Sequence, residues 1–181
     1  IPQSPMVGYG NHRWIPLIAN NDDFSDDFAI IQKFKSLEDR KERINKKRNE
    51  LIDECRNAAA SCKTLIFTSE HLQSRLRRIE EIQRLKKLVE ELASSIRILI
   101  YIRDPLKSAV SLLSTAIKGG GSWVGLPSPQ QQSIENLCYH AQIIRRWQKC
   151  FPDAEIIVRR FERSFLEKGD IVIDFCFFGR R

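Results

Sequence analysis

Arg103 and Ser111 have the residue types and the spacing to hold a phosphate group. Arg103 follows the apolar run 96–102 and precedes Asp104 and Pro105, which suit the start of a helix. A helix N-terminus favours anions, and a guanidinium adds a bidentate donor. Ser111 would lie roughly 10 Å along that helix, within reach of the same phosphate. The alternative is that Arg103 only pairs with Asp104 or caps another helix.

Glu70 and His71 form a second candidate group, for proton transfer. They follow another apolar run, residues 63–68. A histidine whose pKa is close to neutral can remove the proton of a hydroxyl that acts as a nucleophile. The alternative is that His71 only caps the helix expected after Ser69. His12, in a loop rich in Gly and Asn, is a further candidate, although a loop histidine more often has no chemical role.

These residues require an α/β domain to position them. Apolar runs predict buried strands at 63–68, 96–102 and 155–159, and the run 96–102 is typical of a parallel strand covered on both faces. Periodic apolar residues predict helices over about 27–58, 72–92, 105–118 and 129–150, after a loop over 1–27. We therefore expect a parallel sheet flanked by helices. Glu70, His71 and Arg103 follow carboxyl ends of strands, where such sheets bind ligands.

The segment ILIYIRDPLKSAVS, residues 98–111, resembles the 3′-phosphate-binding segment of sulfotransferases that use 3′-phosphoadenosine 5′-phosphosulfate (PAPS). The resemblance implies that Arg103 and Ser111 hold the 3′-phosphate. The segment KTLIFTSEHL, residues 63–72, is similar to the strand that delivers the general base in this family. It implies that His71 is the base, or Glu70 as in carbohydrate-modifying members. Residues 8–14, with His12, are similar to a segment of bacterial sulfotransferase-like proteins.

One feature of the family is missing. Its first strand leads into a loop of the form Pro-Lys-x-Gly-Thr that binds the 5′-phosphosulfate, and the chain has no such loop. The resemblance implies a P-loop nucleotide-binding-like fold, and we expect the chain to be truncated at its N-terminus or to be a degenerate relative. Without the loop lysine, the chain alone is expected to be nearly inactive.

Composition limits the remaining possibilities. The chain has 181 residues and a formal net charge of +7, and we expect one partial domain over 1–181. No apolar run is long enough to span a membrane. Five scattered cysteines and three histidines show no metal-ligand spacing, so we expect no metal, reduced thiols and a cytoplasmic location. The acceptor and the oligomeric state are not indicated.

The basic segments 40–48 and 75–87 leave a second function open. They would suit a non-catalytic module that binds nucleic acid or an acidic partner on a degenerate fold. Interleaved acidic residues favour a solvated helix face instead, which makes nucleic acid the weaker hypothesis. The leading hypothesis is an enzyme that transfers sulfonate from PAPS to a hydroxyl or amine, with a small-molecule or carbohydrate acceptor. A nucleotide-binding α/β domain indifferent to the 3′-phosphate is a third.

Overall fold

A computed structural model of the chain describes residues 12–121, 125–126, 128 and 131–179. The chain divides into two compact units, residues 1–94 and 95–181. They are called unit 1 and unit 2, and each is described by itself. The expectation of one domain over 1–181 stays a prediction.

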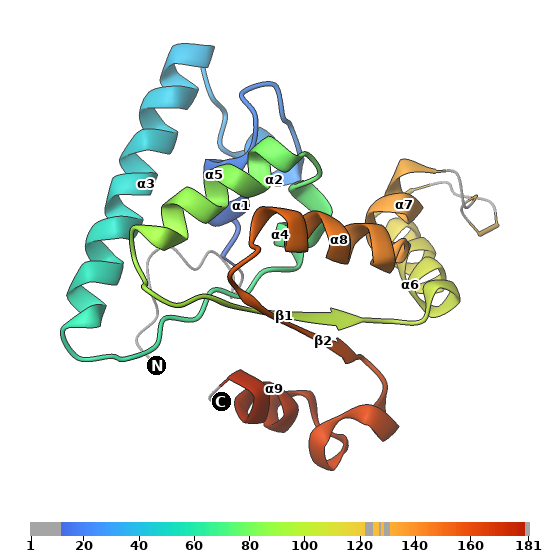
Figure 1. The fold of residues 1–181 in the computed structure, drawn as a ribbon. Coiled ribbons are helices and arrows are strands. Elements are labelled where there is room, and N and C mark those ends of the chain that lie inside the picture. Colours follow the sequence, from blue (N-terminus) through green and yellow to red (C-terminus); the bar gives the residue numbers. More distant parts are fainter. Residues whose placement is uncertain (1–11, 122–124, 127, 129–130, 180–181) are drawn as a thin grey trace. The chain divides into compact units, whose positions relative to one another are not determined.

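Unit 1 is helical in its described part, and a short central helix organises it (Figure 1). Its helices are α1 (Trp14–Ala19), α2 (Asp27–Ile31), α3 (Leu37–Ala59), α4 (Glu70–Arg75) and α5 (Ile79–Glu90). Helix α1 packs against α3, α4 and α5, and its Ile15 and Leu17 are almost fully buried. The loop expected over 1–27 is therefore wrong for residues 14–19. The core is completed by Leu51, Ile52, Cys55, Leu76, Ile82, Leu85 and Leu88.

The helix expected over 27–58 is broken between α2 and α3. Lys33 has a positive φ of 50°, which an α-helix does not contain. Ser36 then caps α3 by accepting a hydrogen bond from the Asp39 N–H at 3.2 Å. The Asp39 carboxylate accepts in turn from the Lys35 N–H at 2.8 Å. These local side-chain bonds begin a new helix, although the apolar periodicity continues across the break.

The helix expected over 72–92 is also broken, between α4 and α5. The buried carboxylate of Glu81 accepts hydrogen bonds from the backbone N–H groups of Arg77 and Arg78 at 2.8 and 2.9 Å. Glu81 is the third residue of α5, so this is the glutamate half of a capping box. Leu76, between the two helices, is completely buried and anchors the bend.

The strand expected over 63–68 is wrong. These residues form no regular secondary structure, and Ile66 is 52% exposed. The backbone of Thr68 pairs instead with His12: the His12 N–H donates to the Thr68 carbonyl at 3.3 Å, and the Thr68 N–H donates to His12 Nδ1 at 3.2 Å. A β-rich run becomes a strand only beside another strand, and none of the described residues pairs with this run in a sheet.

Unit 2 contains the parallel pair that the apolar runs predict, which confirms the α/β class in its coarse form. Strands β1 (Arg97–Ile102) and β2 (Glu155–Arg160) pair in register from Arg97 opposite Glu155 to Ile102 opposite Arg160. The connection between them holds α6 (Pro105–Lys118), α7 (Gln132–Cys138) and α8 (His140–Cys150). Such a helical crossover is what parallel neighbours require. Helix α6 begins and ends where expected, at Pro105 and before Gly119.

The helix expected over 129–150 is broken at Tyr139, whose ψ of 63° ends α7. The Tyr139 carbonyl accepts from the Ile143 N–H at 3.1 Å and starts α8. On the two helices Ile134, Ile143 and Trp147 are buried, whereas Ala141 is exposed. Positions 129 and 130 lie outside the described residues.

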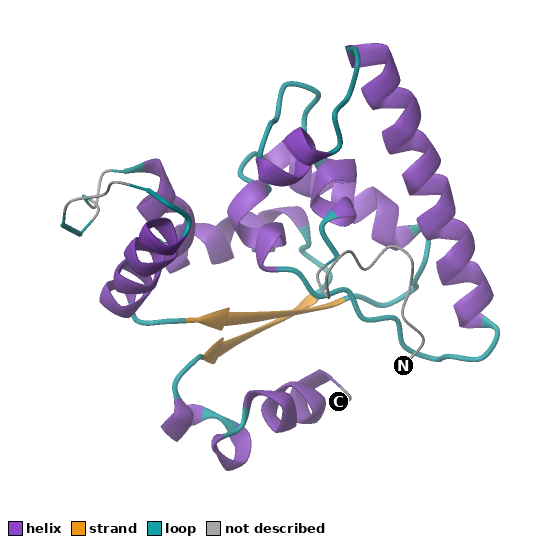
Figure 2. Ribbon diagram, turned by 180° about the vertical axis from the view of Figure 1, so that it is seen from behind, coloured by secondary structure: helices purple, strands orange, loops and turns teal. Residues whose placement is uncertain are grey.

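After β2 come two short 3-10 turns, η1 (Arg163–Phe165) and η2 (Glu167–Gly169), and helix α9 (Ile171–Gly179). Helices α8 and α9 lie on opposite sides of the strands (Figures 1 and 2). The Asp174 carboxylate of α9 is completely buried and accepts from the Arg159 guanidinium at 2.6 and 3.1 Å. It also accepts from the Tyr101 hydroxyl and the Glu167 N–H, both at 2.8 Å. One carboxylate thus joins β1, β2, η2 and α9.

This network shifts the pKa values of its members. The hydrogen bond from Arg159 lowers the pKa of Asp174. Burial, followed by the hydrogen bond to Asp174, raises the pKa of Tyr101 well above its ordinary range. The network is therefore an ionised carboxylate with a neutral phenol and a charged guanidinium as donors.

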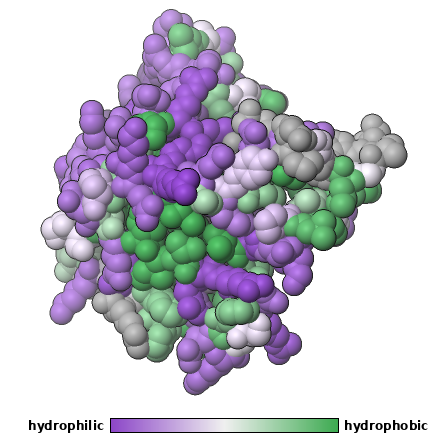
Figure 3. Space-filling model, turned by 45° about the vertical axis from the view of Figure 1, so that its right-hand side comes forward, coloured by the Kyte–Doolittle hydropathy of each residue, from purple (hydrophilic) through white to green (hydrophobic). Residues whose placement is uncertain are grey.

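Unit 2 leaves much apolar surface uncovered. Strand β1 is half-buried rather than fully buried, and α6 has no buried residue. Leu106, Val110 and Ile117 of α6 are between 50% and 62% exposed. Hydrophobic side chains reach the molecular surface in the view of Figure 3. None of the helices in the described ranges has the length and apolar composition to cross a bilayer.

We expect Asp174→Asn to destabilise unit 2 by about 3 kcal/mol, because it removes the charge that pairs with Arg159 and leaves that guanidinium without its partner. Urea denaturation of the full chain measures this difference. Asp153→Asn, in the exposed turn before β2, is the matched control, with an expected change within about 0.5 kcal/mol. Equal stability of the two variants would contradict the central role of Asp174.

The same network predicts a pH dependence. Because the pKa of Asp174 is lowered in the folded state, ionised Asp174 stabilises the fold above the ordinary carboxyl value of about 3.9. This stabilisation is lost as the pH falls through the lower folded value. The stability gap between the wild type and Asp174→Asn should therefore be full at neutral pH and shrink on acidification toward about pH 3. A gap of constant size over that range would rule out the ionised network.

Candidate functional site

The turn after β1 places Arg103 at the carboxyl end of the parallel pair. Arg103 is exposed, and its guanidinium carbon lies 5.2 Å from the centre of the Phe161 ring. Phe161 is the residue after β2, so both residues mark the same end of the sheet. A cation over an aromatic face is held loosely and keeps its N–H donors available at the ring's edge. Arg103 therefore neither enters the core nor caps a helix.

The residues after Arg103 form the expected helix start. The Asp104 carboxylate accepts from the Lys107 N–H at 3.0 Å, and the Asp104 carbonyl accepts from the Ser108 N–H at 2.9 Å. Pro105 occupies the first turn, where its lack of an N–H costs nothing. Asp104 is thus the cap of α6, and no ion pair joins it to Arg103 within the described part of the chain.

Ser111 lies two turns into α6 and is exposed. It lies within the regular helix, and its carbonyl also accepts from the Thr115 side-chain hydroxyl at 2.9 Å. The backbone at Ser111 is therefore fixed by the helix, while its side chain faces solvent. Arg103 and Ser111 are both accessible to a ligand at the start of α6.

Helix α4 carries the two candidate bases, and here Ser69 provides the cap. The Ser69 hydroxyl accepts from the His71 N–H at 3.2 Å, so the His71 side chain is not used for capping. That side chain is only 13% exposed, and its Nε2 lies 3.6 Å from the largely exposed Glu70 carboxylate. His71 Nδ1 is buried with no hydrogen-bond partner among the described residues. The imidazole is held by burial rather than by a hydrogen bond.

Burial and two arginine charges favour the neutral form of His71. Burial is the main cause that lowers the pKa of His71, and the positive charges of Arg13 and Arg75 lower it further. Arg13 donates to the Asp27 carboxylate at 2.6 Å, and Arg75 donates to the Asp26 carboxylate at 3.1 Å. At neutral pH the imidazole can therefore accept a proton.

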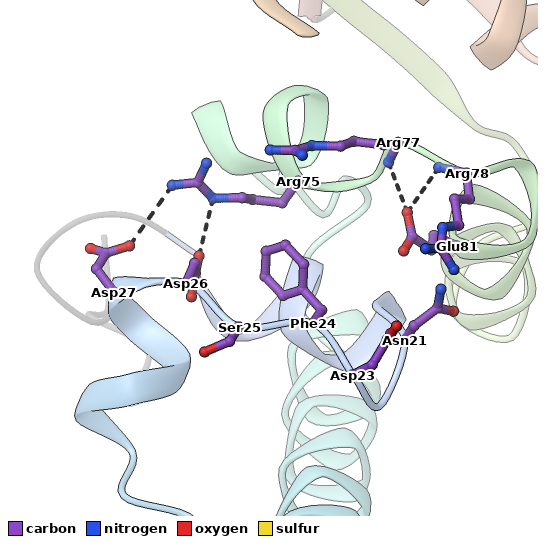
Figure 4. A pocket seen from close by; sticks show the side chains of 10 residues that line it. All are labelled: Asn21, Asp23, Phe24, Ser25, Asp26, Asp27, Arg75, Arg77, Arg78 and Glu81. Carbon is purple, nitrogen blue, oxygen red and sulfur yellow. Dashed lines mark hydrogen bonds and ion pairs between the residues drawn. The ribbon is translucent and has the colours of Figure 1, made fainter. Parts of the chain in front are cut away.

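A polar cavity of about 660 Å³ lies beside Arg75 (Figure 4). It is lined by the loop before α2 and by the bend between α4 and α5, which contribute Asn21, Asp23, Phe24, Ser25, Asp26, Asp27, Arg75, Arg77, Arg78 and Glu81. Within this lining Arg75 pairs with Asp26 at 3.1 Å and with Asp27 at 3.8 Å, and Phe24 is the one aromatic ring. The sequence analysis did not predict this cavity. One part of its lining lies in a segment expected to be a loop, and the other part lies at a bend in a segment expected to be one continuous helix.

His12, the second histidine candidate, has a structural role in the described chain. Its Nδ1 lies 2.9 Å from the Thr68 carbonyl and 3.2 Å from the Thr68 N–H. Its ring also meets Phe67 edge-on, with centroids 6.0 Å apart. These contacts join the segment before α1 to the segment before α4.

The basic segments are largely paired within unit 1. Lys41 pairs with Asp22 at 3.4 Å, Arg43 with Asp39 at 3.8 Å, and Lys86 with Glu90 at 3.4 Å. Lys47 and Arg48 pair with Glu50 and Glu91. Exposed pairs of this kind contribute little stability, but they reduce the positive potential that a nucleic acid would meet.

The four predicted site residues fall into two pairs, Glu70 with His71 in unit 1 and Arg103 with Ser111 in unit 2. Nε2 of His71 lies 3.6 Å from the Glu70 carboxylate, whereas Arg103 lies in the turn after β1 and Ser111 lies two turns into α6. Over the described ranges, no group of three His, Cys, Asp or Glu side chains is arranged to hold a metal ion. Comparison with models of protein families, with curated proteins and with solved structures found no match.

We expect the pKa of His71 to lie below the ordinary histidine value of about 6.5, which NMR titration of the imidazole measures. Arg75→Gln should raise this pKa, because it removes one nearby positive charge. Lys87→Gln, at an exposed position of α5, is the control and should leave the titration unchanged. A wild-type pKa above the ordinary value would contradict the neutral imidazole.

Proposed function

We propose that the chain is a sulfotransferase-like protein that transfers a sulfonate group from PAPS to a hydroxyl or amine of an acceptor. The observation that carries this proposal is the turn after β1. It presents an exposed arginine at the carboxyl end of a parallel strand and an exposed serine two turns into the following helix, Arg103 and Ser111. The proposal includes a P-loop-like sulfotransferase fold.

Side chains, rather than the helix N-terminus itself, would hold the 3′-phosphate. Pro105 has no N–H, and the N–H groups of Lys107 and Ser108 are bound to Asp104. Only Leu106 leaves an N–H for a ligand in the first turn of α6. The fit therefore depends on the Arg103 guanidinium, which can give two parallel N–H donors, and on the Ser111 hydroxyl.

Proton removal is assigned to helix α4. PAPS, when bound, supplies the sulfonate group, and the acceptor must lose a proton as its oxygen or nitrogen bonds to sulfur. The neutral imidazole of His71, or the carboxylate of Glu70 beside it, would take that proton. The missing Pro-Lys-x-Gly-Thr loop would neutralise the leaving phosphate, so we expect the chain alone to be nearly inactive, although it binds the nucleotide.

The cavity of unit 1 supports a carbohydrate acceptor. Asn21, Asp23 and Ser25 offer polar groups for sugar hydroxyls, and the Phe24 ring offers an apolar surface for a sugar face. Asp26 and Arg75 connect this lining to the charge cluster that acts on His71. A polar cavity with one aromatic ring fits a sugar better than an apolar phenol or lipid.

Calorimetry with adenosine 3′,5′-bisphosphate and with 5′-AMP tests the proposal. The wild type should bind the bisphosphate at least about tenfold more tightly, since a bidentate arginine–phosphate pair contributes more than 1.4 kcal/mol. Arg103→Ala and Ser111→Ala should remove most of this preference. Arg145→Ala, at an exposed position of α8, is the matched control and should keep it.

Other results would favour the other two functions. Equal affinity for the two nucleotides, unchanged in Arg103→Ala, would favour a nucleotide-binding domain without sulfotransferase character. Binding of generic DNA with a steep dependence on salt, together with no nucleotide binding, would favour the basic binding module.

A further inference from the structure

The junction between α7 and α8 binds the backbone of the turn that carries Arg103. His140 Nε2 lies 2.6 Å from the Arg103 carbonyl oxygen. Nearby, the Cys138 thiol donates a weaker hydrogen bond to the Pro105 carbonyl, with a sulfur–oxygen distance of 3.6 Å. Both contacts lie within unit 2. The first reaches the carbonyl group before Asp104, and the second reaches the carbonyl group after it.

The Arg103 carbonyl is the first one beyond the β ladder. The ladder ends where the Phe161 N–H donates to the Ile102 carbonyl at 2.7 Å. On the other side, the Asp104 carbonyl already accepts the first hydrogen bond of α6, from Ser108. The carbonyl between them belongs to neither the sheet nor the helix, and His140 supplies its donor. This contact fixes the peptide plane between Arg103 and Asp104.

The contact determines which ring nitrogen of His140 carries a hydrogen. A carbonyl oxygen only accepts, so His140 Nε2 must carry the hydrogen. Nδ1 is buried and has no hydrogen-bond partner among the described residues. The break at Tyr139 makes His140 the first residue of α8. In the continuous helix expected over 129–150, its side chain would follow a different direction.

We propose that His140 is a positioning residue for Arg103, a role that rests on the proposed function of Arg103 in binding the 3′-phosphate. The peptide plane after Arg103 sets its ψ angle, and with it the direction in which the side chain leaves the backbone. With that plane held, the backbone of Arg103 keeps one orientation relative to helix α6, and the Phe161 ring then limits the directions open to the guanidinium. Preorganisation of this kind strengthens binding without a contact between His140 and the ligand.

The test compares His140→Leu, which removes the donor, with His140→Gln, whose side-chain amide can still donate to the carbonyl. In the full chain, His140→Leu should weaken binding of adenosine 3′,5′-bisphosphate about tenfold, or about 1.4 kcal/mol, and leave 5′-AMP binding unchanged. His140→Gln should retain most of the affinity. A merely structural role of His140 would weaken binding of both nucleotides alike, and that result would overturn the proposal.

A second measurement needs no nucleotide. NMR relaxation of the Arg103 side-chain Nε reports how ordered the guanidinium is on the fast timescale. Its order parameter should fall in His140→Leu and recover in His140→Gln, and an unchanged value in His140→Leu would refute the positioning role. If the order parameter falls but the wild type shows no preference for the bisphosphate, the 3′-phosphate assignment fails and the role in binding fails with it. The two failures are thus distinguished.

Discussion

The buried carboxylate of Asp174 is the contact on which the arrangement of unit 2 depends. A charge without solvent must be matched by donors, and Asp174 receives them from β1, β2 and the η2 turn. Arg159 reaches it from β2 and Tyr101 reaches it from β1. Because the strands are short and their apolar faces are half-exposed, hydrophobic burial alone gives them weak support. The polar network is therefore what holds α9 and the two strands in one register.

The register of the two strands also affects the turn after β1 that carries Arg103. Arg160 is the last paired residue of β2, and Phe161 follows it, with its N–H on Ile102 and its ring under the guanidinium of Arg103. A shift of one residue between the strands would turn Phe161 to the other face of the sheet. The position of Arg103 thus depends on strand pairing from one side and on the His140 contact from the other. The phosphate-binding hypothesis rests on a turn supported at both ends.

Sequence patterns predicted the parts of the fold in which local and tertiary preferences agree. The almost continuously apolar run 96–102, followed by Asp104 and Pro105, predicted β1 and the start of α6, because strand burial and helix capping both act there. Three long helices were predicted without their breaks. Ser36 and Glu81 are capping residues that the sequence displays, but the apolar periodicity continues past them and concealed the boundary. The helix boundaries therefore follow the local capping interactions and not the apolar periodicity.

Long-range pairing accounts for the rest. The run 63–68 has strand composition, yet its Thr68 pairs with His12, a contact between residues 56 positions apart that composition does not indicate. The contact of His140 with Arg103 spans 37 positions and has no sequence signature. Of the candidate site, residue types and the strand–turn–helix spacing of Arg103 and Ser111 were visible. The backbone contacts that support Arg103, and the arginine pair beside His71, required the structure.

The two proposed roles require side chains in different charge states. Phosphate recognition needs a permanent positive charge with accessible donors, and Arg103 meets this because it is exposed and has no carboxylate partner in the described chain. Proton removal needs a neutral group, and His71 meets this because burial and two arginines oppose its charged form. Those arginines are themselves paired with Asp26 and Asp27, and the charge of Asp26 partly opposes the lowering of the His71 pKa. Burial and this arginine pair therefore favour a neutral imidazole at the proposed base, and the polar cavity beside Arg75 suits the proposed hydroxylated acceptor.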